Sequence, residues 1–154
     1  MNTPLLSDAI LVVDDDADSR ELLVEYLEVK GFTVHAAPTG ETALTLADVF
    51  RPRVILMDLS MPNLDGLETT RRLRANTSTR AATIVMVTAR AFIGDRNAAH
   101  CAGCDFFIPK PYDLPTVATL VAGLMSARPQ TAGRLPLNFD PQSRTSLRRL
   151  RRTP

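Results

Sequence analysis

The chain has 154 residues, of which 45% are apolar and 5% aromatic, and it contains no Trp. These values fit a single domain with an aliphatic core. No basic N-terminal stretch precedes an apolar segment, and no run approaches about 18 uncharged apolar residues, so we expect a soluble, cytoplasmic protein without a membrane span.

The net charge of +1 hides an asymmetry between two parts of the chain. Residues 127–154 hold seven Arg and one Asp, a surplus of +6, while the other 126 residues hold 11 basic and 16 acidic residues, a charge of −5. The basic part offers too little apolar surface to offset about 1–2 kcal/mol of backbone entropy per ordered residue. We therefore expect a folded domain over 8–126 and a mostly disordered Arg/Pro-rich tail over 127–154.

The first part of the domain predicts two strand–helix units. An aliphatic run predicts a strand over 9–13, because unbroken runs of this length suit strands buried on both faces of a parallel sheet. A helix over 19–30 follows and ends at Gly31, a residue type that suits the left-handed position after a helix. A second strand over 33–36 leads to a helix over 39–50 that opens on a capping threonine. The apolar faces of these helices are expected to be Leu22, Leu23, Tyr26 and Leu27, and Ala43, Ala47 and Phe50.

Three more units complete the domain. Apolar runs predict strands over 54–57, 83–87 and 105–108. Helices are expected from a capping Asp65 to Arg74, over 94–102, and from a capping Asp113 with Pro115 in its first turn. This (βα)₅ alternation, with short right-handed connections, predicts a doubly wound, three-layer α/β fold of the flavodoxin-like type, with parallel strand order 2-1-3-4-5.

Polar side chains follow four of the five apolar runs. Asp14 and Asp15 follow the first, Asp58 the third, Thr88 the fourth, and Lys110 the fifth. Because the ligand crevice of such a sheet lies at the carboxyl ends of its strands, we expect these groups to converge on one edge. Two unit charges 4 Å apart repel by about 4 kcal/mol at an effective dielectric of 20, so three carboxylates there require raised pKa values or a bound cation. An all-oxygen ligand set favours Mg²⁺.

The remaining groups suit phosphoryl transfer. A nucleophilic carboxylate can form an aspartyl phosphate, while an ammonium group and a hydroxyl can bind the oxygens of the transferred group. The chain contains no Gly-rich phosphate-binding loop, so a nucleotide donor is not expected.

Residues 8–126 resemble the receiver domain of two-component response regulators. The resemblance rests on four motifs in the family's order: Asp14-Asp15, Asp58 within "LMDLSMPNLDG", Thr88-Ala89 and Lys110-Pro111. It implies a stand-alone receiver in histidine-to-aspartate signalling that acts as a phosphorylation switch on a partner protein or as a phosphate shuttle. Such a domain is not an enzyme in the ordinary sense but catalyses its own phosphorylation and dephosphorylation.

The resemblance also implies a role for each site residue. Asp58 is expected to be the phosphoacceptor, with Thr88 and Lys110 binding the acyl phosphate. Mg²⁺ is expected on Asp15, Asp58 and the backbone carbonyl of Ser60, with Asp14 acting through water. The Lys110–Pro111 bond is expected to be cis, and Phe107 to be the aromatic residue that turns inward with Thr88 on phosphorylation, although it also fits a plain core position.

The expected phosphoryl donor is a phosphohistidine on a sensor histidine kinase or a histidine phosphotransfer protein, and the output partner is an unknown protein. Three alternatives stay open at this stage. The Arg-rich tail could bind nucleic acid, although its basic segment SRTSLRRLRRTP lacks aromatic residues and a recognition fold. The domain could be a phosphorylation-independent adaptor, or it could be the receiver part of a longer transcriptional regulator.

Two smaller motifs have plain structural interpretations. Cys101 and Cys104 form a CxxC motif, but the chain has no other Cys and only two His, so a zinc site lacks ligands and small-residue packing is favoured over redox chemistry. Asp16, the third acid after the first strand, is assigned no ligand role, since it fits a helix cap.

Overall fold

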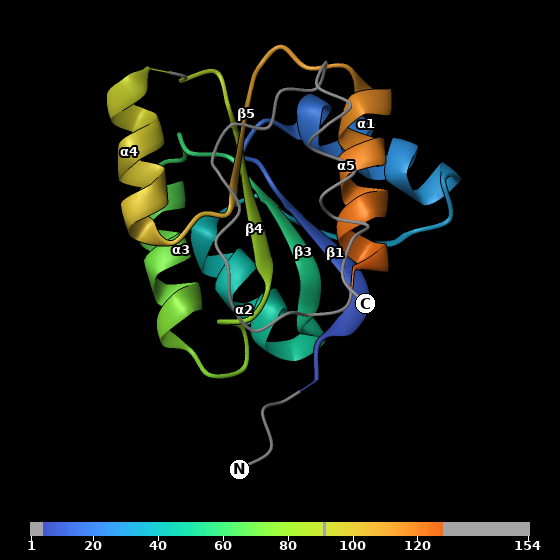
Figure 1. Cartoon of the computed structure of the whole chain (residues 1–154), viewed down its shortest axis with the longest axis horizontal. Helices are drawn as coiled ribbons and strands as arrows, with labels where there is room; N and C mark the ends of the chain where they lie inside the picture. Colours follow the sequence, from blue (N-terminus) through green and yellow to red (C-terminus); the bar gives the residue numbers. More distant parts are fainter. Residues whose placement is uncertain (1–4, 91, 128–154) are drawn as a thin grey trace.

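The computed structural model describes residues 5–90 and 92–127 (Figure 1). It contains a five-stranded parallel sheet in the order β2-β1-β3-β4-β5. In chain order the elements are β1 (Ser7–Val13), α1 (Ala17–Val29), β2 (Thr33–Ala37), α2 (Gly40–Phe50), β3 (Pro52–Met57), α3 (Gly66–Ala75), β4 (Thr83–Thr88), α4 (Ile93–Ala102), β5 (Phe106–Pro109) and α5 (Leu114–Ser126). The predicted doubly wound fold and its strand order are confirmed.

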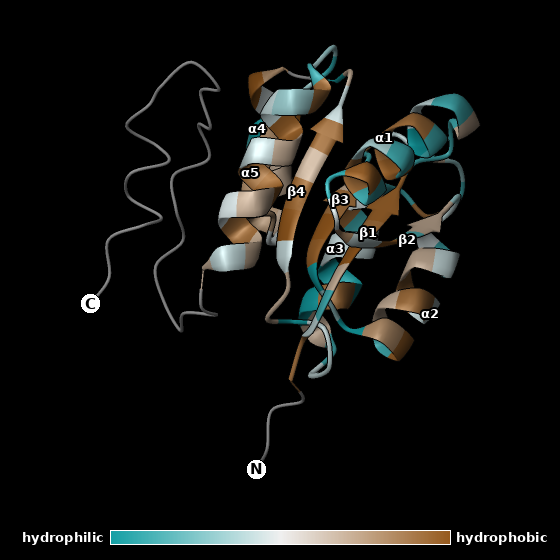
Figure 2. Ribbon diagram, turned by 90° about the vertical axis from the view of Figure 1, so that its right-hand side faces the viewer, coloured by the Kyte–Doolittle hydropathy of each residue, from teal (hydrophilic) through white to brown (hydrophobic). Residues whose placement is uncertain are grey.

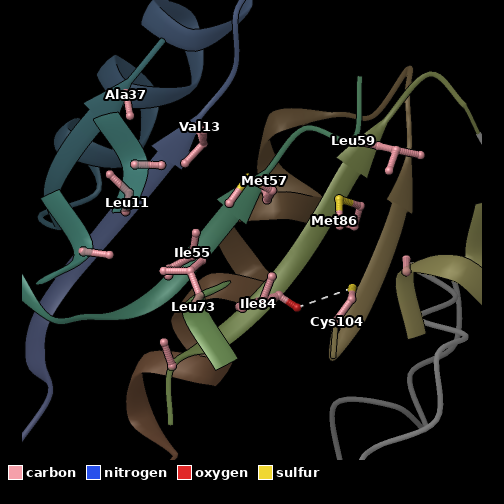
Figure 3. Close-up of a cluster of buried hydrophobic side chains, with 14 of the residues drawn as sticks. Leu11, Val13, Ala37, Ile55, Met57, Leu59, Leu73, Ile84, Met86 and Cys104 are labelled. Carbon is pink, nitrogen blue, oxygen red and sulfur yellow. Dashed lines mark hydrogen bonds between the residues drawn. The ribbon is translucent and has the colours of Figure 1, made fainter. Parts of the chain in front are cut away.

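Helices cover both faces of the sheet, so the strands are buried from two sides. Alternate residues of β1 point to opposite faces: Ile10 and Val12 pack with α1 and α5, whereas Leu11 and Val13 pack with α2, α3 and α4. Figure 1 shows these two helix layers, and Figure 2 shows that β1, β3 and β4 are largely hydrophobic. Figure 3 shows the core on the side of the sheet covered by α2, α3 and α4. Apart from Phe107 and the sulfur-containing residues, this core is entirely aliphatic. The continuous apolar runs of the sequence therefore correspond to strands covered on both sides.

Side-chain caps begin four of the five helices. Thr39, Asp65 and Asp113 each accept a hydrogen bond from the backbone N–H three residues on, which confirms the predicted caps. Asp16 caps α1 in the same way, with Ser19 N–H 2.9 Å from its carboxylate. Helix α4 instead follows Phe92, whose side chain makes no capping bond.

One helix face differs from the prediction. Leu23 and Leu27 are buried, but Leu22 is 56% exposed and lies outside the core. Successive side chains of an α-helix point in directions about 100° apart around the helix axis, so two adjacent leucines cannot both point directly at the sheet. Phe50 is also more exposed than expected, and its ring stacks on His35 with the centroids 3.7 Å apart.

The edge formed by the N-terminal ends of β4 and β5 is closed by an ion pair. Arg74 of α3 places Nη2 2.6 Å from Oδ2 of Asp105, and the same oxygen accepts the Ile84 N–H at 2.9 Å. Arg74 also donates through Nε to the Gly103 carbonyl at 2.9 Å and through Nη1 to the Ala82 carbonyl at 2.5 Å. These bonds join α3 to the segments that precede both strands.

The CxxC motif does not form a metal site or disulfide within the described residues. Cys101 is exposed, whereas Cys104 is buried and its thiol donates to the Phe106 carbonyl at 2.6 Å. Burial raises the pKa of the Cys104 thiol to about 11, so the group stays protonated at neutral pH. The packing interpretation therefore holds for Cys104.

The described part of the chain contains no helix that is both long enough and apolar enough to cross a membrane. Residues 128–154 lie outside the described residues, so the expected disorder of the tail stays a prediction.

The two adjacent leucines of α1 provide a matched test of the core. Leu23→Ala should lower the free energy of unfolding by about 2–5 kcal/mol, because it leaves a cavity beside the sheet. Leu22→Ala removes the same atoms from an exposed position and should change it by less than about 0.5 kcal/mol. Urea unfolding followed by circular dichroism measures both. Equal losses for the two variants would contradict the burial described here.

Candidate active site

Pairing between β1 and β3 brings two aspartates together at the carboxyl edge of the sheet. Val13 pairs with Met57, and each is the last residue of its strand, so Asp14 and Asp58 lie side by side. Carboxylate oxygens of Asp14, Asp15 and Asp58 all lie within 4.8 Å of one another. Asp14 and Asp58 are buried, whereas Asp15 is exposed.

Lys110 from the end of β5 joins the acidic cluster. Its Nζ donates to Oδ2 of Asp14 at 2.8 Å and lies 3.7 Å from Oδ2 of Asp58. The backbone N–H of Lys110 donates to the Thr88 carbonyl at 2.8 Å, which ties the end of β5 to the end of β4. The peptide bond between Lys110 and Pro111 is cis.

Backbone amides orient the other oxygens of the two buried aspartates. Oδ1 of Asp14 accepts from the Asp16 N–H at 3.0 Å, and Oδ1 of Asp58 accepts from the Ser60 N–H at 3.2 Å. In both residues the second oxygen, Oδ2, is thereby directed toward Lys110. The side chain of Asp16 is engaged in capping α1.

Burial and charge set the protonation of this cluster. Burial raises the pKa of Asp58; the negative charge of Asp14 raises it further, and Lys110 opposes both effects without cancelling them. Burial alone would lower the pKa of Lys110, but its hydrogen bond to Asp14 and the charge of Asp58 outweigh this and raise it. One ammonium group thus faces three carboxylates, so the ionised cluster carries an excess of negative charge.

The acidic cluster fits a hard divalent cation. Its donors are all oxygens, and no hydrogen bond or ion pair among the described residues occupies the Asp15 carboxylate. Asp15 is exposed to water while Asp14 and Asp58 are buried, which suits Mg²⁺, an ion that keeps several water ligands. A bound cation would also offset the excess negative charge.

The remaining predicted residues lie around this cluster in different settings. Thr88 ends β4 and is buried; its Oγ1 accepts from the Arg90 N–H at 3.1 Å, so the hydroxyl proton can still be donated elsewhere. Phe107 is 1% exposed and lies in the core, with the Arg96 guanidinium 5.3 Å from its ring centroid. Arg90, two residues beyond Thr88, is paired with Asp95 through Nη2 at 3.0 Å.

Comparison with known proteins identifies the family. A family model described as the response regulator receiver domain matches residues 10–122. This chain belongs to the response regulator receiver domain family. Receiver domains are the signalling switches of two-component systems, and they bind Mg²⁺ at an acidic site. Response regulators interact with histidine kinases or phosphotransfer proteins and with output targets.

Two curated relatives and two solved structures illustrate the similarity. "Response regulator MprA" of Mycolicibacterium vanbaalenii is 39% identical over 116 residues, which cover 75% of this chain and 49% of the relative. The protein of the same name from Mycobacterium ulcerans is 38% identical over 120 residues, covering 78% and 51%. The chain thus spans about half the length of these relatives.

Among solved structures, a putative response regulator from Chloroflexus aurantiacus is 28% identical with a TM-score of 0.72, covering 77% of this chain and 98% of that one. The chemotaxis protein CheY4 of Vibrio cholerae gives a TM-score of 0.72 at 24% identity, covering 78% and 99%, and supports the fold alone.

Two residues that hold this receiver site together were missed by the sequence analysis. A Cβ on Gly66 would lie 2.2 Å from the Asp58 carbonyl oxygen and 2.9 Å from Leu59 Cα, so only glycine lets α3 begin this close to the end of β3. Arg20 donates through Nη1 to the Asp14 carbonyl at 2.8 Å and holds the acidic loop from the start of α1. The sequence could have indicated both residues, because each is unfavourable at its position in a helix. Glycine weakens a helix, and a positive charge is disfavoured near a helix N-terminus.

Gly66→Ala should destabilise the receiver and weaken its metal site, because the new methyl group must push α3 away from Asp58. We expect the free energy of unfolding to fall by about 2 kcal/mol or more, as for other overpacked positions. Gly94→Ala is the matched control, since a Cβ there meets nothing within 4 Å. That variant should gain up to about 1 kcal/mol from helix propensity. Thermal melts with and without Mg²⁺ compare the two, and a Gly66→Ala protein as stable as Gly94→Ala would contradict the contact.

In chelator-treated, metal-free protein, Asp58→Asn should raise stability and Asp14→Asn should lower it. The raised pKa of Asp58 means that folding disfavours its ionised form, so replacement should raise the Tm at neutral pH. The gain should disappear as pH falls through the pKa of Asp58 in the folded protein toward the ordinary carboxyl value, because the Asp58 side chain of the parent is then also neutral.

Asp14→Asn instead breaks the 2.8 Å contact to Lys110 and should cost about 1–3 kcal/mol.

Mg²⁺ provides the internal control for these melts. A ligand that binds only the native state adds about 2.7 kcal/mol at a hundredfold excess over Kd, so millimolar Mg²⁺ should raise the parent Tm and leave that of Asp58→Asn nearly unchanged. A parent Tm that does not respond to Mg²⁺ would refute the metal site.

Proposed function

We propose that this receiver is a phosphorylation-dependent switch whose phosphoacceptor is Asp58. One observation carries the proposal: a single ammonium group, Lys110 Nζ, contacts Asp14 at 2.8 Å and lies 3.7 Å from Asp58, where three carboxylates meet. A buried carboxylate beside a fixed cation is placed to attack phosphorus, because the cation stabilises the negative charge that develops on the phosphoryl oxygens.

The donor is a phosphohistidine of a sensor histidine kinase or of a histidine phosphotransfer protein. Oδ2 of Asp58 forms a new O–P bond as the P–N bond of the donor breaks, and the imidazole leaves and takes a proton. The Ser60 N–H fixes the other oxygen of Asp58, so Oδ2 is the free nucleophile. The absence of a Gly-rich phosphate loop from the sequence supports a protein or small-molecule donor over a nucleotide.

Mg²⁺ would be held by the carboxylates of Asp15 and Asp58 and the carbonyl of Ser60, with Asp14 acting through water. When bound, it supplies positive charge to the phosphoryl oxygens and offsets the repulsion among the aspartates. Asp15 suits this role best, since it is exposed and its oxygens have no other partner among the described residues.

The output signal would pass through Thr88 and Phe107 to an unidentified partner protein. The Thr88 hydroxyl has a proton to donate, and an acyl phosphate on Asp58 would offer it an acceptor. Thr88 then moves toward the site, and the Phe107 ring, which is already buried two register positions away along the β4–β5 pair, shifts into the space that Thr88 leaves. This changes the surface that a partner reads.

Incubation with Mg²⁺ and acetyl phosphate or phosphoramidate tests the phosphoacceptor. Intact mass should show one phosphate per chain, labile to hydroxylamine, and Asp58→Asn should abolish it. Asp16→Asn is the matched control, because Asp16 neighbours the site but serves as a cap, and Asn caps a helix equally well. That variant should be labelled at the parent rate. Labelling of Asp58→Asn at the parent rate would show that another residue accepts the phosphate.

A further inference from the structure

The outward face of α1 carries a row of acidic side chains. Asp18, Glu21, Glu25 and Glu28 are all exposed and lie three or four residues apart, so they share one side of the helix. None of them forms an ion pair within the described part of the chain. Like charges at these spacings repel each other, and nothing on the helix relieves that repulsion along this row.

Two exposed apolar side chains lie in the same row. Leu22 is 56% exposed and Val29 is 79% exposed, and they are seven residues apart, about 10 Å along one helix face. The opposite side of α1, with Leu23 and Leu27, already fills the core, so these two residues serve no packing within the domain. Figure 2 shows hydrophilic and hydrophobic residues interspersed along α1. We call this set, Asp18, Glu21, Leu22, Glu25, Glu28 and Val29, the acidic α1 face.

A ligand for the acidic α1 face must combine positive charge with two or more apolar side chains. The chain itself contains such a segment: residues 144–152, RTSLRRLRR, hold five Arg, two Leu and no acidic residue. Its charge of +5 complements the four carboxylates, and Leu147 and Leu150 complement Leu22 and Val29.

The point of attachment makes this contact reachable. Helix α5 packs beside α1 on the same face of the sheet and ends at Ser126 (Figure 1). The 16 residues of 128–143 precede the basic segment, and a chain of that length can span up to about 50 Å, more than the roughly 20 Å length of α1. Tethering on a short linker gives local concentrations on the order of millimolar, which makes weak ionic contacts significant.

We propose that residues 144–152 bind the acidic α1 face of the same chain. The arginines pair with the acidic row while the two leucines cover Leu22 and Val29. The contact is independent of phosphorylation at Asp58. It withdraws both the α1 surface and the basic segment from other partners, so a nucleic acid or protein that binds either one must compete with it.

Amide NMR spectra recorded in millimolar Mg²⁺ test the contact, so that metal binding at the sheet edge is the same in both proteins. The full chain is compared with a chain that stops at Ala127, at about 0.1 M and about 1 M salt, where the screening length falls from about 10 Å to about 3 Å. At the lower salt, amide shifts along α1 should differ between the two proteins, and at the higher salt the difference should be largely lost. Shift differences that do not change over a tenfold range of protein concentration would identify an intramolecular contact.

Charge reversal in the full chain supplies the specificity control. Glu21→Lys with Glu25→Lys should abolish the tail-dependent shifts, whereas Glu41→Lys with Asp48→Lys, an equal change on the exposed side of α2, should preserve them. The proposal fails if α1 amides are identical in both proteins at low salt, if the shifts centre on another element, or if they grow with protein concentration. It also fails if the α1 amides are unaffected and the tail instead gives the full chain a salt-sensitive affinity for duplex DNA that the shortened chain lacks.

Discussion

The contact between Lys110 and Asp14 is the interaction on which the site depends. Three carboxylates within 4.8 Å repel each other strongly, and the fold holds them there because one ammonium group lies 2.8 Å from Asp14 and 3.7 Å from Asp58. The same contact joins the end of β5 to the end of β1 across two intervening strands. The lysine therefore both permits the acidic cluster and fixes its position in the fold.

Backbone groups then define which oxygens are free to react. Amides of Asp16 and Ser60 take one oxygen each of Asp14 and Asp58, the Arg20 guanidinium holds the loop by its carbonyl, and Gly66 lets α3 start against Asp58. The site is consequently held by several bonds on its protein side, and Asp15 is its exposed carboxylate. A site held in this way with an uncompensated charge is suited to respond when a cation or a phosphoryl group arrives.

Features that follow from the periodicity of the chain and the order of its strands were predictable, while features that depend on how a helix packs against a neighbouring strand end were not. Unbroken apolar runs such as 54–57 correctly indicated doubly covered strands, and the polar residues after them correctly indicated the shared edge. Leu22 was assigned to the core because helical periodicity alone cannot tell which of two adjacent leucines is buried. Only the packing of α1 against the sheet distinguishes them. Gly66 and Arg20 contact backbone atoms of residues after two different strands, and sequence spacing carries no record of such contacts.

The two edges of the sheet illustrate how similar charges serve different ends. At the edge where β4 and β5 begin, Arg74 makes four hydrogen bonds, one of them to Asp105, with which it pairs one to one. The charges therefore balance and the contact is structural. At the edge where the strands finish, Lys110 faces three aspartates, and burial together with the negative charge of Asp14 raises the pKa of Asp58. Stability is supplied where charge is compensated. Reactivity is retained where charge is left in excess, because there a ligand of opposite charge changes the energy of the fold.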